Sequence, residues 1–120
     1  MTVRILKVEP GKTPYVKEID NTLDSIQREV GGGLFQPIYI GSGVTLCCNE
    51  EGKLNGMEPN RRVGDDIICG SFILVGEDED GYFIPLSHRQ VELCTEFFAE
   101  PEHFTGEEPE LDPYVEFFEL

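Results

Sequence analysis

Residues 65–76, DDIICGSFILVG, constrain the fold of this chain more than any other stretch. Apolar side chains occupy both odd and even positions here, so a strand formed by these residues is covered on both of its faces. We therefore expect one strand in the centre of a sheet. The apolar positions on one side are Ile67, Cys69, Ile73 and Val75, and those on the other are Ile68, Phe72 and Leu74.

Two pairs of alternating segments, both earlier in the sequence than this strand, predict hairpins. Residues 2–8 and 14–20 alternate around a Pro-Gly turn, and residues 34–40 and 44–49 flank the tripeptide GSG. Pro37 lies in the first strand of the second hairpin, and proline cannot donate a hydrogen bond to a neighbouring strand. We expect that strand at a sheet edge or at a bulge. Residues 82–86 predict a further short strand.

Two segments carry helix signals. In residues 21–33, Asn21 or Thr22 provides an N-cap and three glycines end the helix. In residues 86–100, Ser87 and Gln90 have the spacing of a capping box. At 120 residues the chain suits one domain. We predict an α+β fold with a mixed, largely antiparallel sheet of about five or six strands and two helices over residues 1–99.

Residues 100–120 form an acidic segment with eight acidic residues, three prolines and no Lys or Arg. This composition is typical of a solvated tail. Asp112 and Pro113 nevertheless begin a helix pattern in which Tyr114, Phe117 and Phe118 share one face. Two interpretations remain open: the segment docks on the domain, or it docks on a partner.

The formal charge of −15 is unevenly distributed along the chain. Residues 1–62 hold eight basic and eight acidic residues, whereas residues 63–120 hold one base, Arg89, against sixteen acids. Binding to phosphates requires clustered Lys and Arg, so this charge argues against direct contact with nucleic acid or an anionic membrane. The sequence shows no apolar run that spans a bilayer and no export signal, and we expect a cytoplasmic protein.

The four cysteines and two histidines form no recognisable metal or catalytic motif. Cys47 and Cys48 are adjacent and point to opposite faces of a strand, and no CxxC pair is present. His88 and His103 are isolated, so no base stands beside a nucleophile. We interpret the cysteines as reduced, buried thiols. We expect no metal, no cofactor and no enzymatic activity.

The residues Asn60, Arg61 and Arg62, followed by Asp65 and Asp66, are a candidate site in the middle of the chain. Two interpretations are open. In the first, an arginine pairs with an aspartate and fixes the connection that leads into the central strand. In the second, an arginine presents a bidentate donor to a nucleotide-like anion.

Four motifs together resemble a small domain-of-unknown-function family of phages, plasmids and conjugative elements. They are VEPGK, NEEGKL, PNR and DIICGSFILVG, and the resemblance covers about residues 3–76. It implies an α+β cytoplasmic domain encoded on mobile DNA, and it implies no activity.

These observations favour a non-enzymatic interaction protein that uses its acidic half to engage a basic surface of a host protein. Spaced carboxylates imitate a phosphate backbone, which suits an inhibitor of a host DNA-binding or nuclease system. The alternatives are a small-ligand module built on residues 60–62, an enzyme, and an acidic surface that only maintains solubility. The predicted partner-binding residues are Glu92, Glu96, Glu100, Glu107, Glu108, Glu110, Asp112 and Glu116.

Overall fold

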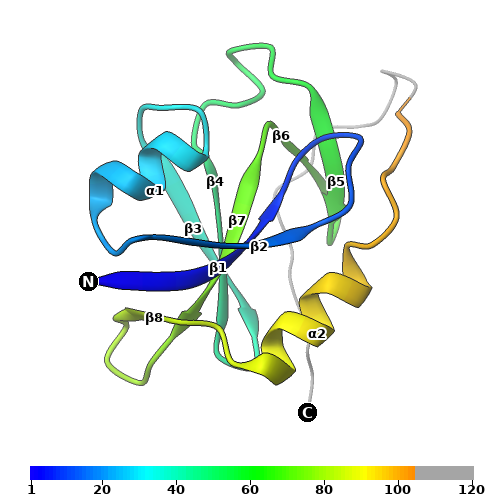
Figure 1. The fold of residues 1–120 in the computed structure, drawn as a ribbon. Helices are drawn as coiled ribbons and strands as arrows, with labels where there is room; N and C mark the ends of the chain where they lie inside the picture. The colour runs from blue at the N-terminus through cyan, green and yellow to red at the C-terminus, as the bar shows by residue number, and fades with distance from the viewer. Residues whose placement is uncertain (105–120) are drawn as a thin grey trace.

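The computed structural model describes residues 1–104, which form eight strands and two helices (Figure 1). The strands are β1 (Thr2–Val8), β2 (Tyr15–Asp20), β3 (Phe35–Gly41), β4 (Val44–Asn49), β5 (Pro59–Val63), β6 (Asp66–Cys69), β7 (Phe72–Glu77) and β8 (Phe83–Ile84). The helices are α1 (Leu23–Glu29) and α2 (His88–Phe97). The described residues contain no helix that is long and apolar enough to cross a membrane.

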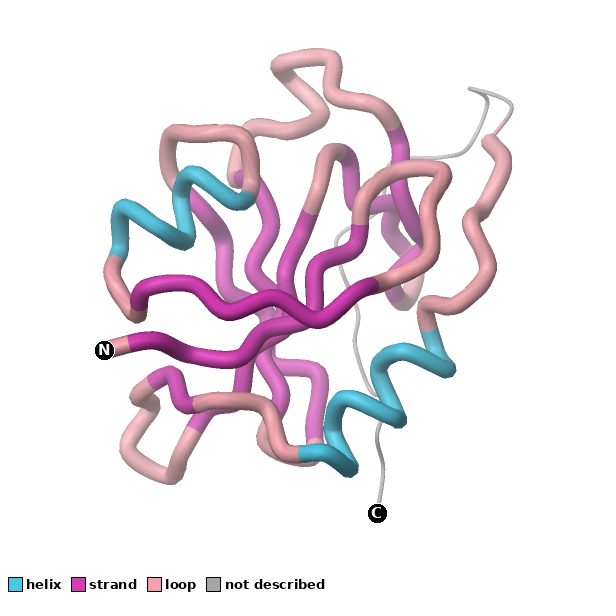
Figure 2. The backbone as a smooth tube through the Cα atoms, viewed as in Figure 1, coloured by secondary structure: helices cyan, strands magenta, loops and turns pink. Residues whose placement is uncertain are grey.

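A six-stranded antiparallel sheet forms the centre of the fold (Figure 2). Its order is β2-β1-β7-β4-β3, and β8 pairs with one end of β7. The predicted α+β class, the two helices and both predicted hairpins are confirmed. β3, which contains Pro37, lies at the sheet edge, because the missing N–H of a proline breaks no pairing there.

The prediction of one strand over residues 65–76 was wrong. The chain turns at Gly70, which has a positive φ of 85°, and separates β6 from β7. β7 takes the central position, whereas β6 pairs with β5 in a separate two-stranded sheet. One long buried strand and two short buried strands give the same apolar pattern in the sequence. Only the backbone conformation at Gly70 distinguishes the two arrangements. Residues 59–63, for which we predicted no strand, form β5.

Each face of the main sheet is covered, which explains why β7 is apolar on both sides. Ile73 and Val75 belong to a cluster that includes Ile26 of α1. Phe72 and Leu74 belong to the other cluster, which contains residues of α2, β5 and β6. Burying a side chain of this size stabilises a fold by about 1.5–3 kcal/mol. The helices therefore lie on opposite faces of the sheet (Figure 1).

Both helices begin at the predicted caps. The Thr22 hydroxyl accepts a hydrogen bond of 3.2 Å from the Ser25 N–H at the start of α1. Ser87 and Gln90 form the predicted capping box at the start of α2. The Gln90 amide also donates to the Ser42 carbonyl at 2.8 Å, which ties this end of α2 to the β3–β4 turn.

Candidate functional site

Arg61, a predicted ligand-binding residue, is buried in β5, with 1% of its surface exposed. Its Nε and Nη2 donate to the Phe98 carbonyl at 3.3 and 3.0 Å, and Nη2 also donates to the Lys12 carbonyl at 2.6 Å. Its Nη1 donates to the carbonyl and the side-chain oxygen of Asn60, at 3.3 and 2.8 Å. These contacts use the five N–H donors that a guanidinium carries, so none is left for a ligand.

Asn60 is also completely buried and completes the same arrangement. Its amide donates to the Val8 carbonyl at 2.8 Å and to the Gly70 carbonyl at 2.9 Å. We call these two residues and their contacts the Asn60–Arg61 clamp. The clamp joins the end of β1, the turn between β6 and β7, and the end of α2.

The clamp compensates a buried positive charge with backbone carbonyls. Burial lowers the pKa of Arg61, and the nearby Glu102 carboxylate acts in the opposite direction. Phe98 is the C-cap of α2, so the guanidinium lies at the negative end of the helix dipole. A guanidinium remains charged in proteins, and this position stabilises its charge.

The other predicted residues of this segment lie outside the clamp. Asp66 forms an ion pair with Lys53 and accepts a hydrogen bond of 2.8 Å from the Ile67 N–H. Within residues 1–104, neither arginine forms an ion pair with Asp65 or Asp66, so the clamp differs from the expected arginine–aspartate pair. The Arg62 and Asp65 side chains are exposed. The ligand hypothesis therefore rests on Arg62.

The acidic residues of α2 lie where a partner can reach them. Glu92 and Glu96 are exposed one helical turn apart, and Glu100 is exposed just beyond the helix. The one base of this region, Arg89, is also exposed, and its guanidinium lies 3.9 Å from the Glu92 carboxylate. Arg89 therefore offsets only part of this charge. The predicted residues Glu107, Glu108, Glu110, Asp112 and Glu116 lie outside the described residues.

The segment after α2 runs beside β5 (Figure 1). The Glu102 carboxylate accepts a hydrogen bond of 3.0 Å from the Arg62 backbone N–H, on the side of β5 that does not face β6. The contact shields part of an exposed strand edge. The clamp and this contact together hold the chain from the end of α2 to Glu102 against β5.

Three of the four thiols are buried, as expected for structural cysteines. Burial raises the pKa of Cys47 and Cys94 to about 12 and that of Cys48 to about 11. These groups are protonated at neutral pH and are poor nucleophiles. Residues 1–104 contain no cluster of three or more His, Cys, Asp or Glu residues that could hold a metal ion.

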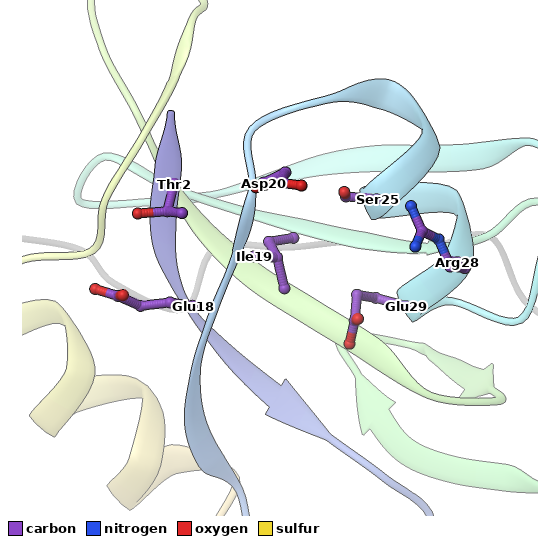
Figure 3. Close-up of a pocket in the computed structure, with 7 residues that line it drawn as sticks. All are labelled: Thr2, Glu18, Ile19, Asp20, Ser25, Arg28 and Glu29. Atoms are coloured by element: carbon purple, nitrogen blue, oxygen red, sulfur yellow. The ribbon is translucent and has the colours of Figure 1, made fainter.

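Sequence reasoning missed a polar pocket of about 260 Å³ between β2 and α1 (Figure 3). One of its lining residues, Glu29, accepts hydrogen bonds from Lys7 and Lys17, each at 3.0 Å. Burial opposes ionisation of Glu29, but the two lysines outweigh it and lower the pKa of this carboxyl. The only signal in the sequence was the placement of Lys7 on the inward side of its strand. We interpret the contacts of Glu29 with the two lysines as a structural link between α1 and the sheet.

Together these features define a small three-layer α+β domain whose most buried polar residues hold the fold together. The chain belongs to the family described as Domain of unknown function (DUF3846), whose profile matches residues 1–99. The match ends one residue beyond Phe98, the C-cap of α2. Searches of curated proteins and of solved structures found no match.

Proposed function

We propose that this protein is a non-enzymatic acidic interaction protein of a phage or mobile genetic element, acting in the bacterial cytoplasm. It engages a basic surface of a host protein, such as a nucleic-acid-binding or nuclease protein of a defence system. The observation that carries the proposal is the exposed row of Glu92, Glu96 and Glu100, which leads into a segment with seven further acids and no Lys or Arg.

Charge spacing limits how this surface can imitate DNA. Residues four apart on a helix are separated by a rise of about 6 Å along its axis, whereas duplex DNA carries one negative charge per about 1.7 Å of its axis when both strands are counted. Along its axis, α2 alone therefore carries a lower density of negative charge than duplex DNA does. Mimicry requires the acids of residues 100–120 to contribute alongside α2.

The end of α2 and the residues just after it are held in place, which favours binding by the acidic surface. The Asn60–Arg61 clamp holds the end of α2, and the Glu102 contact holds the first residues beyond it. Groups that are already ordered lose less conformational entropy when a partner binds. This arrangement supports an interaction role over a charge that only maintains solubility.

The test compares two variants that each remove three exposed acids. The first is Glu92→Gln, Glu96→Gln and Glu100→Gln, and the matched control is Glu50→Gln, Glu51→Gln and Glu58→Gln in the β4–β5 loop. Each full-length protein is immobilised and exposed to host lysate at low salt. We expect the wild type and the control to retain a nucleic-acid-binding protein that rising salt releases, and the first variant to lose most of it.

A purified partner then separates mimicry from other acidic contacts. If the protein imitates DNA, duplex DNA competes for the same partner surface and displaces it. Equal retention by all three proteins, or retention that ignores ionic strength, would contradict the proposal. If duplex DNA fails to displace the protein while salt-dependent retention persists, the protein binds a basic partner but does not imitate DNA.

A further inference from the structure

An apolar groove of about 370 Å³ lies between the start of α1 and the turn that connects β7 to β8. Its residues Ile26, Phe35 and Phe83 belong to or pack against the core cluster on the α1 face of the sheet. Two large side chains beside them are left in solvent: Leu23 is 61% exposed and Tyr82 is 70% exposed. The groove therefore combines a base anchored in the core with exposed apolar walls, which is typical of an interaction site.

Hydrogen bonds hold both walls in place. The Asn21 amide donates to the Phe83 carbonyl at 3.1 Å and connects the start of α1 to β8. The Asp78 carboxylate accepts hydrogen bonds from the backbone N–H groups of Asp80 and Tyr82, each at 2.9 Å, and so fixes the turn. Formation of the groove does not require binding to a partner.

The surroundings of the groove are acidic. Asp20 and Asp24 flank the wall formed by α1, and Glu79 and Asp80 precede the wall formed by Tyr82; all four are exposed. Residues 18–27 and 77–88, which supply both walls, contain no Lys or Arg. Positive charge at the edges of a bound segment therefore increases its affinity for the groove. A lysine or arginine also interacts favourably with the face of an exposed tyrosine such as Tyr82.

We propose that this groove binds a segment of a partner protein that carries a large apolar side chain flanked by Lys or Arg. The charge argues against two other occupants. Residues 105–120 hold six acids and no base, and a second copy of this chain would bring the same acidic rim into contact with its own. Like charges placed together oppose association.

The groove is independent of the surface in the proposed function. It lies with α1 on one face of the main sheet, whereas α2 packs on the other. Substitutions in the groove leave the carboxylates of α2 unchanged, so the two proposals succeed or fail separately.

The probe is a library of random dodecapeptides displayed on phage and selected on the full-length protein. We expect enriched peptides that combine an aromatic or aliphatic residue with flanking Lys or Arg. One enriched peptide is then synthesised, and its affinity is measured by fluorescence anisotropy. The double variant Leu23→Ser and Tyr82→Ser should weaken binding by roughly tenfold or more, as expected for central apolar contacts.

Matched controls keep the result interpretable. Leu54→Ser removes another exposed leucine, 86% exposed in the β4–β5 loop, and should bind the peptide as the wild type does. Thermal unfolding checks that the double variant remains folded. Replacing the peptide's Lys and Arg by Gln should weaken binding most at low salt.

Several outcomes would overturn the proposal: a selection without enrichment, or equal affinity of the selected peptide for the wild type and the double variant. Enrichment of acidic aromatic peptides would instead point to residues 105–120 as the occupant. A dimer in sedimentation that disappears in the double variant would point to a second copy.

Discussion

Replacing Arg61 by Met tests whether the Asn60–Arg61 clamp holds the fold together. The change preserves most of the buried volume but removes the Arg61 donors to two buried acceptors, the Phe98 carbonyl and the Asn60 side-chain oxygen, as well as the donor to the part-buried Lys12 carbonyl. A buried acceptor left without a donor costs about 1–3 kcal/mol, so two of them cost about 2–6 kcal/mol. Removing the desolvated charge offsets part of this loss. We expect the free energy of unfolding to fall by about 2–4 kcal/mol.

The neighbouring residue provides the control. Arg62→Met removes the same charge from an exposed side chain and should change the free energy of unfolding by less than about 0.5 kcal/mol. Arg61→Lys should lower the free energy of unfolding by an amount between those of the two Met variants, because lysine keeps the charge but lacks the planar set of donors. Urea unfolding followed by circular dichroism measures all three. Equal midpoints and slopes for Arg61→Met and Arg62→Met would refute the reasoning.

Four further predictions follow from the packing, the charges and the thiols. Gly76→Ala should cost about 1–3 kcal/mol in urea unfolding, because a Cβ there would lie 2.8 Å from the Ile84 carbonyl oxygen. Glu29→Gln should destabilise the protein at neutral pH, because folding lowers the pKa of the Glu29 carboxyl from 4.5. The difference in stability between this variant and the wild type should shrink as the pH falls below 4.5, which unfolding at several pH values measures. Under native conditions at pH 8, a thiol reagent should react rapidly with no more than one of the four cysteines, Cys69, and with all four after unfolding. If the nucleotide-like ligand hypothesis holds, a nucleotide should raise the melting temperature and Arg62→Ala should abolish the effect, whereas a flat screen counts against it.

Local signals predicted the elements of this fold well. Thr22 and Ser87 cap the helices where the spacing placed them, and both hairpins follow their alternating residues. These features depend on hydrogen bonds and side-chain directions within a few residues, so they can be read along the chain. The same holds for the uneven charge, which is a property of the sequence alone.

The candidate site was less predictable because its contacts are distant in the sequence. Arg61 reaches the carbonyl of a residue 37 positions away, and Asn60 reaches one 52 positions away. A pair of arginines before a pair of aspartates suggested an ion pair between them, yet the acceptors of Arg61 are backbone carbonyls. Every residue carries a carbonyl, so no sequence pattern marks the ones that a buried guanidinium will meet.

The sequence by itself therefore determined the α+β class, the helix caps, the hairpins and the concentration of negative charge in residues 63–120. Only the tertiary structure decided that the apolar run breaks at Gly70, that Arg61 is internal while Arg62 is exposed, and that Leu23 and Tyr82 flank one groove. The physical reason is that backbone conformation at a glycine and burial of a side chain depend on which distant segments pack together.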